Sequence, residues 1–491
     1  MNVQIRRLFL LLLALFAALI AISAYWLWRA PELEARQGNP TLVVRQVTIN
    51  RGLILAADGT VLARNRRREV QGETWYTRVY PQQDLAAQTV GYSTIDRSRA
   101  GLEQSMNDFL TGSNGNLSTL VDKVVDKVTG RTQQGNSLVL SLDIEAQRQA
   151  QELLASACGA VVALEPSTGR VLVLASSPAY DLNLVADDFQ SILDLEGPCR
   201  PAAPLVNRGT AGLYSPGSTF KVLTAAAALE SGRFTPESEF DDPGYCLLYG
   251  KRVTNFADQT GPQVFGRITL AQALENSVNS VFCEIGKELG PIRILETARR
   301  FGFYEKPPLE TPAEERLASG LYRSGELFFP QDPNAADPGR LAFGQERLLV
   351  TPIQMAMVAA GIANGGVVMK PQVVQRILKP DGSILSQTAP EELSEAISSE
   401  TAAELTAMME LAVQSGTGTA AQIPGVSVAG KTGTAETGRP EANNAWFIGF
   451  APSDLPRVAI AVVLSDQAGT GGQLAAPIAR ELIGTLLTSV A

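Results

Sequence analysis

A serine and a lysine three residues apart are the first side chains in the sequence whose types and spacing suit catalysis. Pro216 and Gly217 predict a turn that leads into a helix, with Ser218 at the helix N-terminus. Free backbone N–H groups and the positive end of the helix dipole meet there and can stabilise an oxyanion. Lys221 follows on the same face, and burial among apolar neighbours would lower its pKa until it can deprotonate the serine. A helix cap beside a surface lysine has the same pattern, so further motifs are needed to distinguish a catalytic pair from this structural interpretation.

The chain contains no histidine. Its composition therefore excludes Ser-His-Asp and Cys-His arrangements and histidine-ligated zinc. An enzyme built from these residues must use Lys, Tyr, Asp, Glu or Cys as proton carriers. Lys221 is then the chemically sensible base for Ser218.

Ser277 and Asn279 form a second motif, inside or beside a predicted helix. The Ser277 hydroxyl can relay a proton. The Asn279 amide can bind a substrate amide while it also holds Lys221.

A third motif, Lys431-Thr432-Gly433-Thr434, stands at the end of an apolar strand. Lys431 and Thr432 offer a cation and a hydroxyl to a carboxylate, and Gly433 lets another backbone approach closely. The three motifs in this order are a far more specific signal than any one of them.

Around these motifs the pattern predicts an α+β domain, residues 137–491, in which one antiparallel sheet carries a helical insertion. Asp143 is the expected N-cap of its first helix. The predicted strands are 137–142, 159–164, 170–175, 427–431, 445–450 and 458–464, and the predicted helices are 143–157, 219–231, 269–289, 351–364, 401–414 and one from 476.

Upstream of this domain, residues 29–136 predict a small β-containing pedestal domain. It has too few apolar residues to be an independent enzyme. Asp58-Gly59 lies between two apolar runs, which is a strong hairpin signal. The basic cluster Arg64, Arg66, Arg67 and Arg68 is interpreted as a solvated hairpin edge, and the net charge of −9 argues against nucleic acid as a partner.

Residues 8–28 predict a single transmembrane anchor behind a cytoplasmic tail of residues 1–7. The run is apolar, and a helix of about 20 residues spans about 30 Å. Arg6 and Arg7 precede it, which favours a cytoplasmic N-terminus and an extracytoplasmic catalytic domain. A cleaved signal peptide is the alternative, although the run is longer than a typical signal core.

Four cysteines are present, and none forms a CxxC pair, so neither a metal site nor a cofactor is predicted. Cys283 would lie one helical turn after Asn279, and Cys246 lies in the connection that leads back to this helix. In an exported domain this arrangement predicts a Cys246–Cys283 disulfide, with Cys158 and Cys199 paired or free. Four buried thiols are the alternative interpretation.

With these motifs in place, the chain resembles the class B penicillin-binding proteins from the anchor to the C-terminus. The resemblance implies a penicillin-binding/serine β-lactamase-like transpeptidase fold. Asn444 stands where many relatives carry histidine, and none of the roles that the three motifs can fill needs that histidine. The stretches that carry the resemblance, besides the three motifs, are Arg51-Gly-Leu-Ile, Asp58-Gly59, Gly101-Leu-Glu103, Gly159 to Gly169, Gly344-Gln345, Thr351-Pro352-x-Gln354 and Trp446 to Pro452.

The resemblance implies a role for each motif residue. Ser218 would be the nucleophile and Lys221 its base, with Ser277 and Asn279 as proton relay and substrate contact. Lys431 and Thr432 would bind the terminal carboxylate of the substrate, beside Gly433 and Thr434. The backbone N–H groups of Ser218 and Thr434 would form the oxyanion hole.

The function implied is a peptidoglycan D,D-transpeptidase that cross-links wall stem peptides through an acyl-enzyme on Ser218 and is a target of β-lactams. A membrane glycosyltransferase of the SEDS type is the implied partner. The short pedestal is closer to division- or sporulation-associated members than to rod-elongation members.

Two other functions use the same motifs. A D,D-carboxypeptidase or β-lactamase would hydrolyse the acyl-enzyme, but the anchor, the pedestal and the length of 491 residues speak against a β-lactamase. A β-lactam receptor needs a cytoplasmic effector or several spans, and only seven residues precede this predicted span.

Overall fold

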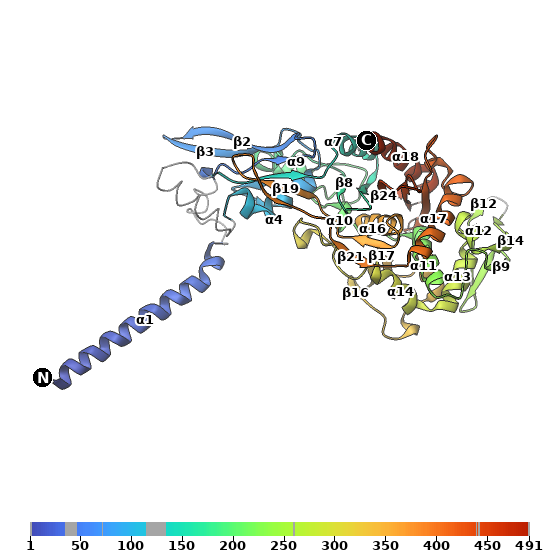
Figure 1. Cartoon of the computed structure of the whole chain (residues 1–491), viewed down its shortest axis with the longest axis horizontal. Coiled ribbons are helices and arrows are strands. Elements are labelled where there is room, and N and C mark those ends of the chain that lie inside the picture. Colours follow the sequence, from blue (N-terminus) through green and yellow to red (C-terminus); the bar gives the residue numbers. More distant parts are fainter. Residues whose placement is uncertain are drawn as a thin grey trace.

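The computed structural model describes residues 2–34, 47–70, 72–113, 134–258, 261–437, 439 and 442–489. Its first element, α1 (Asn2–Glu34), is a long helix (Figure 1). The segment Val3–Trp26 is long and apolar enough to cross a membrane, and none of it is buried inside the described protein.

A six-stranded sheet forms the core of the pedestal, in the order β20-β19-β6-β1-β2-β3. The chain turns between β1 and β2 at Asp58 and Gly59, with Gly59 at a φ of +87°, as the Asp-Gly pair predicts. The strands are β1 (Ile54–Leu55), β2 (Val61–Val70), β3 (Glu73–Val79), β6 (Ser137–Leu140), β19 (Val374–Leu378) and β20 (Ile384–Gln387).

Three strands of this sheet come from beyond the predicted domain boundary at residue 136. β6 pairs in parallel with β1 and antiparallel with β19, which in turn pairs with β20. The sheet therefore continues across the expected boundary, and the domain limits stay a prediction. Sequence order hides this pairing because β19 and β20 lie far from β6 in the sequence, between helices of the insertion.

A buried ion-pair cluster fastens the pedestal sheet to two short helices, α4 (Gly101–Ser105) and α5 (Asn107–Leu110), and α3 (Ala87–Val90) lies beside α4. Glu103 is fully buried and accepts from Arg51 at 2.7 Å and from Arg78 at 2.5 Å. Burial alone would raise the pKa of Glu103, but the two guanidiniums outweigh burial and hold that pKa below its usual value. Arg51 and Glu103 belong to stretches that carry the family resemblance, and here they join the segment before β1 to α4.

The second domain is built on the predicted antiparallel sheet, five strands in the order β22-β23-β24-β7-β8. Alternate residues of these apolar strands enter two separate cores. Figure 1 shows α7 and α18 near each other beside the C-terminus. Both pack in the smaller core, while α16 packs in the larger core on the other face of the sheet. The elements are β7 (Cys158–Leu164), β8 (Val171–Ser177), β22 (Ala429–Glu436), β23 (Asn443–Ala451), β24 (Val458–Gln467), α7 (Ile144–Leu154), α16 (Pro352–Ala363) and α18 (Gly471–Ser489). The α+β fold with a helical insertion is confirmed.

Local signals located most helices well. Asp143 caps α7 by accepting from the Ala146 N–H, as expected. The last helix begins at Gly471 rather than at 476. The insertion contains α11 (Lys221–Glu230), α12 (Leu270–Glu275), α13 (Asn279–Leu289), α14 (Pro291–Arg300), α15 (Pro338–Ala342) and, after α16, α17 (Ser399–Gln414), with short strands that include β9 (Glu239–Asp242), β10 (Tyr245–Leu248), β11 (Lys251–Thr254) and β14 (Gly266–Thr269).

The single helix predicted over 269–289 is wrong. The chain breaks between α12 and α13, where Ser277 adopts a φ of +60°. A left-handed residue cannot continue a right-handed helix, and the apolar periodicity on both sides concealed the break.

The cysteines form two disulfides. Cys246 on β10 is bonded to Cys283 on α13, with Cα atoms 6.2 Å apart, so the predicted bridge is confirmed. Cys158 and Cys199 are bonded as well, with Cα atoms 4.8 Å apart. The alternative of four buried thiols is wrong.

Candidate active site

The turn that carries Ser218 is a short 3₁₀ helix, Gly217–Phe220, which continues into α11 at Lys221. Ser218 itself is partly exposed. Gly217 has a φ of +52° and donates to the carbonyl of Gly344 at 3.1 Å. A Cβ on Gly344 would lie 1.9 Å from the Gly217 oxygen, so the Gly344 segment presses directly against this turn.

Lys221 is completely buried one turn after Ser218. Its Nζ donates to the Ser277 carbonyl at 2.5 Å, to Asn279 Oδ1 at 2.7 Å and to Ser277 Oγ at 3.3 Å. Burial, followed by the positive charge of Lys431, lowers the pKa of Lys221 well below its ordinary value. A lowered pKa increases the fraction of neutral amine, the form that a general base requires.

The break between α12 and α13 explains how one motif supplies three acceptors. The left-handed backbone of Ser277 turns the chain so that both its carbonyl and its hydroxyl bond to Lys221. Asn279, the first residue of α13, accepts from Lys221 through Oδ1 and donates through Nδ2 to the Thr254 carbonyl at 3.1 Å. The Asn279 amide is therefore held between α11 and β11.

β22 is the edge strand of the five-stranded sheet and passes the Ser218 turn backbone to backbone. A Cβ on Gly433 would lie 2.8 Å from the Pro216 oxygen, and one on Gly217 would lie 2.8 Å from the Thr434 oxygen. Glycine at both positions permits this approach. The backbone of Thr434 is thereby brought beside the turn of Ser218.

Lys431 on β22 is a second fully buried lysine. Its Nζ donates to the Thr432 carbonyl at 3.1 Å, and burial lowers its pKa to about 7. The hydroxyls of Thr432 and Thr417 are bonded at 2.6 Å, and Thr434 Oγ1 accepts from the Gly471 N–H at 3.2 Å.

The structure thus brings together the nucleophile turn, the Ser277–Asn279 break and the β22 edge, which are far apart in the sequence. Sequence reasoning missed one buried carboxylate behind them, Asp242 at the end of β9, which accepts from Ser280 next to Asn279. An isolated aspartate at the end of a short strand carries no recognisable pattern, so the sequence held no signal for it.

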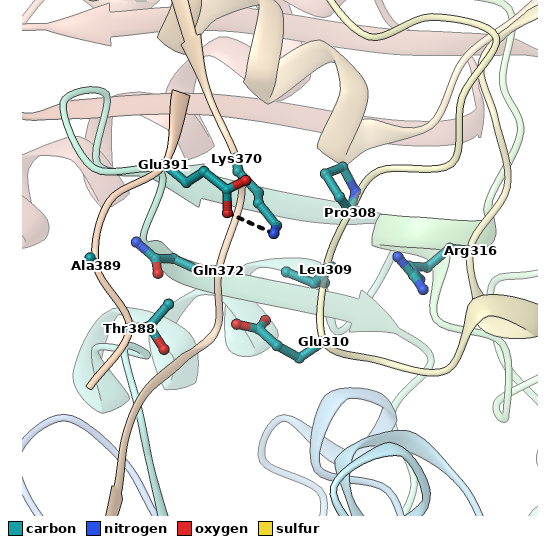
Figure 2. Close-up of a pocket in the computed structure, with 9 residues that line it drawn as sticks. All are labelled: Pro308, Leu309, Glu310, Arg316, Lys370, Gln372, Thr388, Ala389 and Glu391. Carbon is teal, nitrogen blue, oxygen red and sulfur yellow. Dashed lines mark hydrogen bonds and ion pairs between the residues drawn. The ribbon is translucent and has the colours of Figure 1, made fainter. Parts of the chain in front are cut away.

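A cavity of about 460 Å³ lies elsewhere, between the loop before η2 (Ala313–Glu315), the entry to β19 and the segment after β20. Figure 2 shows segments 308–310 and 388–391 on either side of the chain at Lys370 and Gln372, with the Lys370–Glu391 ion pair between them at 2.9 Å. The cavity shares no residue with the set predicted from the sequence. Large volume alone therefore does not locate the candidate site.

Comparison with known proteins gives two family matches. Residues 159–484 match the model of the penicillin binding protein transpeptidase domain, and residues 51–138 match that of the penicillin binding protein A dimerisation domain. The chain is 34% identical over 508 aligned positions to the peptidoglycan D,D-transpeptidase PbpA of Mycolicibacterium smegmatis, with 99% of each chain covered. It is 30% identical to the peptidoglycan D,D-transpeptidase MrdA of Acinetobacter baumannii, over 83% of this chain and 66% of that one.

Solved structures are similar over most of the described chain. The ceftriaxone acyl-enzyme of penicillin-binding protein A from M. tuberculosis has a TM-score of 0.79 and 33% identity, and the match covers 91% of this chain and 100% of that one. The D,D-transpeptidase domain from Eggerthella lenta has a TM-score of 0.76 and 33% identity, covering 90% and 99%.

Proposed function

The chain belongs to the penicillin-binding protein transpeptidase family, and we propose that Ser218 is the residue on which it forms its acyl-enzyme. It is a serine-type peptidoglycan D,D-transpeptidase that forms acyl-enzyme complexes with β-lactams. Its substrates are the stem peptides of the cell wall.

In the first half-reaction, neutral Lys221 takes the proton of the Ser218 hydroxyl, and Oγ attacks the carbonyl between the two terminal D-alanines. The oxyanion that forms is stabilised by the N–H groups of Ser218 and Thr434. The C–N bond then breaks, and the leaving D-alanine takes a proton through Lys221 and Ser277. Lys431 and Thr432 bind the terminal carboxylate of the peptide while this happens.

In the second half-reaction, the amine of a neighbouring stem attacks the ester of Ser218. The amine gives up its proton to the base, the ester bond breaks, and the cross-link forms as Ser218 recovers its hydroxyl proton. β-Lactams imitate the acyl-D-Ala-D-Ala end and stop after the first half-reaction.

One observation carries this assignment of roles: Lys221 is fully buried, its pKa is strongly lowered, and its three hydrogen bonds all go to Ser277 and Asn279. A surface lysine beside a helix cap, the competing interpretation of the first motif, would be exposed with an ordinary pKa.

Labelling with a fluorescent penicillin tests the roles of Ser218 and Lys221. Ser218→Ala should abolish labelling and leave the folded state intact, because a change at a helix terminus costs only about 1 kcal/mol. Lys221→Ala should also prevent acylation although the hydroxyl remains. Labelling of folded Ser218→Ala, or a wild-type rate for Lys221→Ala, would remove that residue from its role.

The fate of the adduct separates cross-linking from hydrolysis. A transpeptidase keeps a stable penicilloyl adduct, whereas a β-lactamase releases penicilloate and regenerates the free serine hydroxyl. Rapid turnover of penicillin by the purified protein would favour the hydrolase.

We also propose that α1 anchors the protein in the plasma membrane, with the catalytic domain outside the cytoplasm. An unburied apolar helix with Arg6 and Arg7 at its start supports this placement. A SEDS-type glycosyltransferase is the proposed partner, contacted through the anchor and the pedestal. Membrane fractionation tests the anchor, and copurification from detergent tests the partner, with a variant lacking residues 1–28 as the control.

A further inference from the structure

Asp242 is a buried carboxylate at the end of β9 that is only 2% exposed. It accepts hydrogen bonds from the backbone of Gly244 at 2.8 Å and of Phe265 at 2.9 Å. It also accepts from Asn255 Nδ2 at 2.9 Å and from Ser280 Oγ at 2.6 Å. A buried carboxylate is stable only when such donors surround it, and together they fix its position.

Two of these donors belong to the chain segments that position the Asn279 side chain. Asn255 directly follows Thr254, whose carbonyl accepts from Asn279 Nδ2. Ser280 directly follows Asn279 itself. Asp242 therefore binds both the segment that accepts from the Asn279 amide and the segment that carries Asn279.

A second contact closes the same network. The Ser280 N–H donates to Asn255 Oδ1 at 2.9 Å, while Val278, the N-cap of α13, provides no side-chain cap. Asn255 thus satisfies a free N–H of the first helical turn, and the charge of Asp242 lies at the end of the helix where the dipole favours an anion. The N-terminus of α13 is held from outside the helix.

From this arrangement we propose that Asp242 is a positioning residue for Lys221. Through Asn255 and Ser280 it holds the Asn279 amide where Oδ1 accepts from the lysine at 2.7 Å. It keeps Lys221 buried on the turn that follows Ser218 and takes no part in bond making. The inference rests on the proposed role of Lys221 as base.

Asp242→Asn in the full-length protein tests the inference, with acylation by a fluorescent penicillin followed across pH. Asparagine presents an N–H group where the carboxylate accepts, so the network loses its centre. We expect the acylation rate constant to fall by roughly 10- to 100-fold, because small misplacements of a catalytic group have effects of this size. The non-covalent affinity for penicillin should change much less.

The pH profile distinguishes positioning from a merely structural role. When Asn279 shifts, Lys221 becomes better solvated and its pKa rises toward the ordinary value, so the acid limb of the profile moves to higher pH. Ser280→Ala removes one hydrogen bond of the network. It should lower the acylation rate constant and move the acid limb to higher pH, each by less than Asp242→Asn does.

Glu239→Gln is the matched control, because Glu239 lies on the same strand but pairs with Arg267 at the surface. It should retain the wild-type rate and profile. A folded Asp242→Asn protein with the wild-type rate overturns the inference, and so does a slower protein with an unchanged profile. If Asp242→Asn does not fold, the acylation rate constant and the pH profile of Ser280→Ala test the inference in its place. Labelling of Ser218→Ala would instead overturn the proposed function.

Discussion

Lys221 and Lys431 are two fully buried lysines, close enough for the charge of Lys431 to add to the effect of burial and lower the pKa of Lys221. The pKa of Lys431 is itself lowered to about 7 by burial. The site therefore contains one lysine suited to be neutral and one that is charged in part near neutral pH. A substrate carboxylate would favour the charged form of Lys431 and raise its pKa.

Lys431→Ala should move the acid limb of the penicillin acylation profile to higher pH. Without the neighbouring cation the pKa of Lys221 rises, so less of this proposed base is neutral at a given pH. The variant should also lose affinity for ligands that carry the carboxylate more than for ligands that lack it. Lys370→Ala, which removes a cation outside the site, is the control and should leave the profile unchanged.

Glu103→Gln should destabilise the pedestal by about 3–5 kcal/mol at pH 7, because Arg51 and Arg78 lose their buried partner. The folded-state pKa of Glu103 is depressed, so its contribution is present above the unfolded pKa and is lost as pH falls through the folded pKa. Urea unfolding of both proteins from pH 3 to 7 measures the difference. The difference in the free energy of unfolding should become smaller toward acid pH. A difference that does not change with pH would contradict a charged Glu103 in the folded protein.

Glu310→Gln should have the opposite dependence on pH. Burial raises the pKa of Glu310, although the backbone N–H groups of Val373 and Val374 oppose this rise. The stabilising effect of the protonated form is complete below the unfolded pKa of about 4.3 and is lost as pH rises through the folded pKa. In thermal unfolding, the Tm of the variant should therefore rise relative to the Tm of the wild type as pH increases. A Tm difference that stays constant with pH would contradict this prediction.

Replacement of both Cys246 and Cys283 by alanine should lower the free energy of unfolding by about 4 kcal/mol in the chain-entropy model, since the bridge spans a separation of 37 residues. Chemical unfolding under non-reducing conditions measures this loss. The corresponding Cys158 and Cys199 variant, with a separation of 41 residues, should lose a similar amount. Free thiols in the denatured, unreduced wild-type protein would show that the bridges are absent.

Features determined by near neighbours could be read from the sequence. The three-residue spacing of Ser218 and Lys221 on one helical turn, the Asp58-Gly59 turn and the Asp143 cap depend on residues only a few positions apart. Each has a recognisable composition because sterics and local hydrogen bonds restrict it. The order of the three motifs indicated the family resemblance, and the resemblance in turn implied the architecture.

Tertiary structure alone decided what depends on distant segments. The left-handed turn at Ser277, the Asp242 network and the entry of β19 into the pedestal sheet arise from contacts across long stretches of chain. The lowered pKa of Lys221 belongs to the same group, since burial and the charge of Lys431 cause it. Desolvation and Coulomb interaction depend on what surrounds a group in space, and a linear pattern does not contain that information.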